Sequence, residues 1–194
     1  MKSIFLSASV PKPGREFYGT ADPMLIQSAV RAFLALVLGR RHVVWGGHPS
    51  ITPMVSAACA GLGLKYFDAV TLCQSRRFLP EFPAENSRFD NLVLTPAESD
   101  VPTCLLTLRT TMFSSHDFEG AVFIGGMNGV LDEHNLFAQM HPHASIVPVH
   151  RPGAAAAQLA LQHGYDPKAD PTPTDFTQLY IDKLNVSPSE QRIV

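Results

Sequence analysis

The alternation of two kinds of apolar segment constrains this chain more than any other feature. Short runs rich in β-branched residues predict strands at residues 4–7, 42–45, 65–72, 91–95, 121–124 and 145–149. Longer segments with helical spacing predict helices at residues 23–38, 52–61, 102–115, 129–140 and 153–163. Such alternation is typical of βαβ units built on a parallel sheet. We therefore expect an α/β fold of Rossmann-like type, a mostly parallel β-sheet with helices on both faces.

The length of the chain favours one domain. Its 194 residues are enough for one domain with a sizeable core and marginal for two. We expect a single domain over residues 1–194, in which residues 165–194 form a C-terminal extension. Prolines cluster after Tyr165, a last short helix is predicted over 174–184 with Thr174 as its cap, and residues 186–194 are expected to form a mobile tail.

Composition narrows the class of protein. Hydrophobic residues make up 45% and charged residues 16%, which is typical of a globular chain, and the net charge of −2 does not favour a nucleic-acid partner. The first apolar run is too short for a signal peptide, and no stretch reaches the ~18 apolar residues of a membrane span. The cysteines are odd in number and are expected to be buried thiols: Cys59, Cys73 and Cys104. We expect a cytoplasmic protein without a membrane partner.

Three predicted strands end in residues that expose backbone amides. Ser7 and Ser9 close the first strand, Gly46-Gly47 followed by His48 closes the second, and Gly125-Gly126 closes the fifth. Glycine lets backbone N–H groups point outward, and the first amides of a following helix attract anions. In an open α/β sheet such turns meet at the ligand site. One glycine pair alone equally fits an ordinary tight turn, but two such turns and a serine-rich third favour a binding site.

Two charged residues are candidates for chemistry. Glu133 lies near the start of the helix that follows Gly126, so its carboxylate can reach a ligand held on that turn; it can equally be an acid that complements the helix dipole. Arg109 lies in the middle of an apolar helix. Its guanidinium then needs a partner, such as a phosphate or the Glu133 carboxylate, unless it occupies an exposed stripe of that helix.

The histidines do not predict a metal site. His134, His141 and His143 form the densest group, but no cysteine or carboxylate at an established zinc spacing accompanies them, and we expect neither a metal nor a cofactor. His48 is different because it follows a glycine pair, where it can bind a ligand or simply pack. The irregular segment 77–88 is read as a ligand rim, a subunit contact or a solvated loop.

Together these motifs resemble the LOG-type phosphoribohydrolases. Their signature is an arginine on a helix and then a strand that ends in P-G-G-x-G-T-x-x-E, which is similar to Arg109 followed by residues 124–133 here. The turn at residues 45–47 is similar to their Y-G-G-G turn, and residues 6–9 look like their C-G-S-S. The matches span residues 1–150 and point to the wider SLOG superfamily of nucleotide-related enzymes and sensors.

The resemblance implies a nucleotide or nucleotide-derived ligand. By motif position, the catalytic roles would fall to Arg109 and Glu133, and the phosphate cradle to Gly125, Gly126, Gly129 and Val130, with Asn128 in the same turn. Three departures favour the sensor-like branches: Val130 replaces threonine, one extra residue separates Gly126 from Gly129, and His48-Pro49 replaces a third glycine. We expect a SLOG-type sensor, with a nucleotide N-glycosidic bond hydrolase as the alternative. The resemblance also implies a homodimer.

Overall fold

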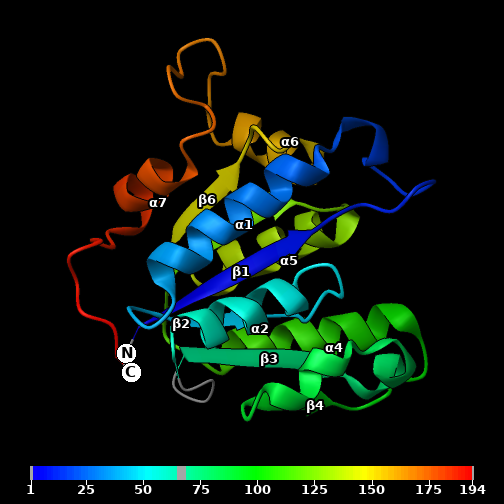
Figure 1. Cartoon of the computed structure of the whole chain (residues 1–194). Coiled ribbons are helices and arrows are strands. Elements are labelled where there is room, and N and C mark those ends of the chain that lie inside the picture. The colour runs from blue at the N-terminus through cyan, green and yellow to red at the C-terminus, as the bar shows by residue number, and fades with distance from the viewer. Residues whose placement is uncertain (1, 65–68, 194) are drawn as a thin grey trace.

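The computed structural model describes residues 2–64 and 69–193, and in this part of the chain six strands form one parallel sheet (Figure 1). Their order is β4-β3-β2-β1-β5-β6, and all their pairings are parallel. The strands are β1 (Ser3–Ser9), β2 (His42–Trp45), β3 (Val70–Ser75), β4 (Leu92–Thr95), β5 (Phe118–Gly125) and β6 (Ser145–Val149). The expected Rossmann-like α/β fold is therefore confirmed. The predicted start of the third strand, residues 65–68, lies outside the described residues.

The helices follow the predicted pattern closely. They are α1 (Pro23–Val37), α2 (Thr52–Gly61), α4 (Val101–Ser114), α5 (Asn128–Met140), α6 (Ala154–Gln162) and α7 (Phe176–Leu184). Aspartate caps three of them, because its carboxylate accepts hydrogen bonds from amides that have no partner within the helix. Asp22 caps α1 and Asp100 caps α4. The prediction of Thr174 as the cap of the last helix was wrong, since Asp175 accepts from the amide of Gln178 and the helix begins at Phe176.

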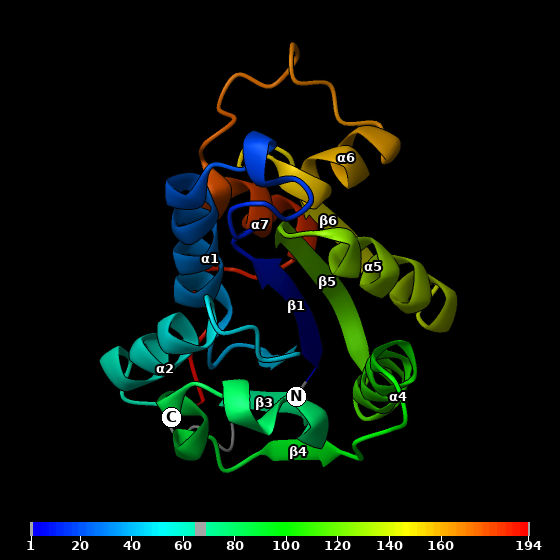
Figure 2. The ribbon, with the colours of Figure 1, turned by 90° about the vertical axis from the view of Figure 1, so that its right-hand side faces the viewer.

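Helices cover both faces of the sheet (Figure 2). Successive side chains of a strand point to opposite faces, and the two cores follow this alternation. Ile4 and Leu6 of β1 pack in the core under α1, α2 and α7, whereas Phe5 between them packs in the core under α4, α5 and α6. Strands buried on both sides explain why their sequences are apolar nearly throughout.

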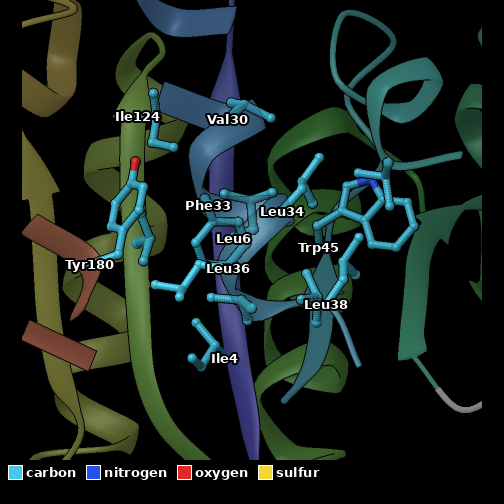
Figure 3. Packing of buried hydrophobic residues seen from close by; sticks show 14 of the residues in the cluster. Ile4, Leu6, Val30, Phe33, Leu34, Leu36, Leu38, Trp45, Ile124 and Tyr180 are labelled. Carbon is cyan, nitrogen blue, oxygen red and sulfur yellow. The ribbon is translucent and has the colours of Figure 1, made fainter. Parts of the chain in front are cut away.

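The larger core is built around α1 (Figure 3). Phe33 of α1 and Tyr180 of α7 meet edge to face, with ring centroids 5.7 Å apart. The Tyr180 hydroxyl donates a hydrogen bond to the Ala29 carbonyl at 3.1 Å, so the buried polar atom is satisfied. Helix α7, which lies in the expected C-terminal extension, is thus an integral part of this core.

Residues 186–193 are tied to the rest of the fold, whereas a mobile tail was expected there. The Ile193 amide donates to the Gly39 carbonyl at 2.8 Å, beyond the end of α1. Arg41 pairs with Glu190 at 2.6 Å and also with Glu119 of β5. These contacts join residues far apart in the sequence, so no local pattern around residues 186–194 predicts them.

The segment 77–88, expected to be irregular, lies within two short 3-10 helices, η2 (Arg76–Glu81) and η3 (Ala84–Arg88), and the residues between them. A third, η1 (Tyr18–Thr20), precedes α1. Among the residues that the structure describes, no helix combines the length and the apolar character that crossing a bilayer requires.

Candidate functional site

The strand order creates a crevice beside β1. From β1 the chain builds outward through β2, β3 and β4 and then returns to place β5 on the other side of β1. In such sheets ligands bind where the strand order reverses, at the carboxyl ends of the strands. A cleft of about 340 Å³ lies at this edge, lined by the ends of β1, β2 and β3, by η2, by one side of α4 and by the first turns of α5.

Glu133 reaches into this cleft from α5. The Ser7 hydroxyl, at the end of β1, donates a hydrogen bond to Glu133 Oε2 at 2.5 Å. Burial raises the pKa of the Glu133 carboxyl above its ordinary value, and the nearby Arg109 charge and the Ser7 hydrogen bond oppose that rise. The cleft therefore holds a fixed carboxylate whose affinity for a proton is increased by its surroundings.

Arg109 approaches the same carboxylate from α4. Only 9% of the residue is exposed, so it does not lie on an exposed stripe of its helix. Its Nη1 lies 3.2 Å from Asp132 Oδ2, its Nη2 donates to the Gly129 carbonyl at 3.3 Å, and its Nε lies 3.8 Å from Glu133 Oε1. The buried Nε has no hydrogen-bond partner. Arg109 thus ties α4 to the first turns of α5 and retains one unsatisfied donor beside Glu133.

The turn after β2 brings three predicted residues to the cleft: Gly46, Gly47 and His48. Gly47 has a φ of +70°, and its carbonyl accepts a hydrogen bond from Gln74 Nε2 at 2.6 Å. The His48 Nδ1 lies 2.8 Å from the Ser50 hydroxyl. Burial and the positive charge of Lys12 lower the pKa of His48 to about 4, so its imidazole is neutral near pH 7.

The turn after β5 divides into two parts. Gly125 and Gly126 are buried and do not line the cleft, whereas the residues after them, from Met127 to Val130, do. The Gly126 amide donates to the Ser9 carbonyl at 2.9 Å, and a Cβ at Gly126 would lie 2.1 Å from Val130 Cγ2. This glycine therefore permits close packing beneath the site, and the start of α5 faces the cleft.

Ten of the twelve predicted site residues line this one cleft, namely Ser7, Ser9, Gly46, Gly47, His48, Arg109, Asn128, Gly129, Val130 and Glu133. The sequence analysis missed further lining residues, above all Gln74 at the end of β3 and Phe78 and Phe82 in the segment after it. The signal that was available is the pair Gln74-Ser75, which is polar at the end of an apolar strand.

Two of the histidines considered for a metal contact other groups. His134 pairs with His163 at 2.8 Å between the ring Nε2 atoms, and the His141 Nε2 lies 2.9 Å from the Phe113 carbonyl. Within residues 2–64 and 69–193, no three histidine, cysteine or acidic side chains are grouped so as to hold a metal ion.

Comparisons with known proteins agree with this architecture. The crystal structure of TM1055, a structural-genomics target, superimposes with a TM-score of 0.54 at 15% sequence identity, covering 83% of this chain and 81% of that one. This similarity shows the fold alone. No curated protein matched the chain. A profile of the SLOG cluster3 family matches residues 16–184, which include η2, Arg109 and Glu133. The chain therefore belongs to the SLOG cluster3 family.

Proposed function

We propose that the cleft binds a nucleotide-derived small molecule and that the protein acts as a sensor of this ligand. The observation that carries the proposal is the convergence of the turns after β1 and β2, the start of α5 and the Ser7–Glu133–Arg109 cluster on one cleft. Its volume of about 340 Å³ is within the range of small-molecule sites.

The start of α5 supports an anionic end for the ligand. The first amides of a helix have no partner within it and lie at the positive end of its dipole. Here Asn128 and Gly129 line the cleft, and the Arg109 guanidinium lies against the Gly129 carbonyl. A phosphate is the group that such a combination of amides and guanidinium binds best.

The packing of Val130 supports binding without turnover. Val130 stands where the related hydrolases have a threonine, and only 5% of it is exposed. Its side chain belongs to the core under α5, so this position supplies no hydroxyl to a phosphate. The site thus offers fewer side-chain donors than the hydrolase motif it resembles.

The Glu133 cluster favours a second candidate, hydrolysis of the N-glycosidic bond of a nucleotide. In that reaction Glu133 takes a proton from water, and the water oxygen attacks the anomeric carbon. The bond from that carbon to the base nitrogen breaks, and the base leaves with the electron pair and gains a proton from solvent. Ser7 and Arg109 would hold the carboxylate in place through the contacts described above.

One experiment separates these candidates. The protein is incubated with AMP, GMP, CMP, UMP or NAD, and melting temperature and released base are measured. A sensor is stabilised by about 5–10 °C at a ligand concentration a hundred times Kd, with no base released. A hydrolase releases base, and the release is lost in Glu133→Gln but not in Asp90→Asn, which alters an exposed carboxylate outside the cleft. If none of the five compounds changes the melting temperature or loses its base, both candidates are rejected.

A further inference from the structure

The two ends of the cleft differ in chemistry. The end formed by β1 and α5 carries Ser7, Arg109 and Glu133. The opposite end, beyond β3, is lined by the aromatic side chains of Phe78 and Phe82, which are partly exposed, and by the exposed Glu81 between them. A cleft of this kind suits an elongated ligand with a charged group at one end and an apolar ring at the other.

The span of the cleft follows from the strand order. The strands that line the cleft run from β1 through β2 to β3, which is two interstrand steps of about 4.8 Å each, so the ends of β1 and β3 are about 10 Å apart. Ser7 projects from β1, one step from β5, and holds Glu133. Glu133 therefore lies at the β1 end of the cleft, about one helical turn along α5 from Gly129.

The aromatic end is held in place by hydrogen bonds to the sheet. The Arg77 amide donates to the Ser75 hydroxyl at 3.3 Å, and that hydroxyl donates to the Pro96 carbonyl at 3.1 Å. On the other side of the segment, Asn86 Nδ2 donates to Gln74 Oε1 at 3.4 Å. Since these bonds anchor the segment on both sides of Phe78 and Phe82, the apolar wall is present before a ligand arrives.

We propose that Phe78 and Phe82 form the ring-binding subsite of the cleft. The inference rests on the proposed function and extends it. The phosphate lies at the start of α5, the sugar lies beside Glu133, and the flat heteroaromatic ring lies against the two phenylalanines. Stacking on an aromatic side chain accepts any base, because every base has a π-face. The subsite thus selects nucleotides over sugar phosphates and discriminates weakly among bases.

The test compares ligands with and without a ring. Dissociation constants are measured for the four nucleoside monophosphates and for ribose 5-phosphate, using the fluorescence of Trp45, the single tryptophan of the chain, which lines the cleft. In Phe78→Ala and in Phe82→Ala, we expect Kd for each bound nucleotide to rise about tenfold. The Kd for ribose 5-phosphate should change less than twofold. Leu79→Ala is the matched control, because Leu79 lies on the same short helix, is 48% exposed and is not part of the cleft lining.

The outcomes separate the inference from the proposed function. Unchanged nucleotide binding in both alanine variants overturns the subsite and leaves the proposed function standing. The subsite is also overturned if Phe78→Leu and Phe78→Ala raise Kd for nucleotides and for ribose 5-phosphate by the same factor. In that case the Phe78 ring only maintains the shape of the cleft. Phe78→Leu keeps the apolar volume, so it provides the measurement if the alanine variant does not fold. If the wild-type protein binds no nucleotide at all, the proposed function itself fails.

Discussion

Replacing Gly47 by alanine tests the geometry of the turn after β2. Its φ of +70° lies in the left-handed region, where a Cβ costs about 1–2 kcal/mol. That Cβ would lie 1.8 Å from Gln74 Nε2 and 2.5 Å from Leu72 Cδ1. The Gln74 amide must therefore swing away from the Gly47 carbonyl, and a buried acceptor left unpaired costs about 1–3 kcal/mol. The free energy of unfolding should fall by about 3 kcal/mol, which corresponds to a melting temperature about 6–12 °C lower.

The neighbouring glycine is the control. A Cβ at Gly46 would meet no atom within 4 Å, and its φ is not positive. Gly46→Ala should leave the melting temperature unchanged or raise it slightly, since alanine restricts the unfolded chain. In the double variant Gly47→Ala/Gln74→Ala, the shorter of the two clashes is absent. The loss of unfolding free energy in the double variant should therefore be smaller than the sum of the losses in the two single variants, by about 1 kcal/mol or more. Equal melting temperatures for the two glycine variants would refute this account of the turn.

Further predictions concern single groups. The pKa of Glu133 is higher in the folded protein than in the unfolded chain, so its contribution to stability is full below the unfolded pKa and is lost as pH rises through the folded pKa. Glu133→Gln should therefore be more stable than wild type at pH 7. This difference should vanish toward pH 4 in urea titrations. The pKa of His48 is about 4 in the folded protein and about 6.5 in the unfolded chain, so its contribution to stability is present above pH 6.5 and is lost as the pH falls through 4. The free energy of unfolding should therefore fall by about 3 kcal/mol between pH 7 and pH 4. NMR titration of the His48 ring checks this directly, and a midpoint near 6.5 would contradict it. Burial raises the pKa of Cys59 to about 11 and that of Cys73 to about 12, so iodoacetamide should label them only after unfolding, as read by mass spectrometry. The homodimer also stays a prediction: Leu106 of α4 is 57% exposed, and if α4 forms the interface, Leu106→Glu should turn a dimer into a monomer in sedimentation velocity. A wild-type protein that sediments as a monomer at every concentration would rule the dimer out.

Most of the fold was predictable because its elements depend on local pattern. The strand His42–Trp45 and the helix Thr52–Gly61 have the predicted bounds. Helix α1 begins at Pro23, where the predicted helix 23–38 begins, because the Asp22 capping side chain and the fixed φ of proline both act within one turn. The cap of α7 was misplaced by one residue, since neighbouring threonine and aspartate are both good caps and only the backbone conformation decides between them.

The candidate site was predictable where its residues follow strands. Ser7, Gly46 and Glu133 were found because small residues and helix starts at strand ends have a known chemistry. Phe78 and Phe82 were missed because they lie in a segment without periodicity, where an aromatic residue is equally consistent with a core, a contact or a ligand rim. Their place in the cleft depends on the hydrogen bonds that hold the segment to β3.

The amino-acid order by itself determined which segments form strands and helices, which faces they bury and which turns expose amides, since these properties arise among residues close in the chain. Only the tertiary structure placed β5 beside β1 and brought Glu133 within 2.5 Å of Ser7. It also joined Ile193 to Gly39, just after the end of α1, by a backbone hydrogen bond. These contacts join residues more than a hundred positions apart. They are decided by strand order and by the burial of whole elements, which no local pattern encodes.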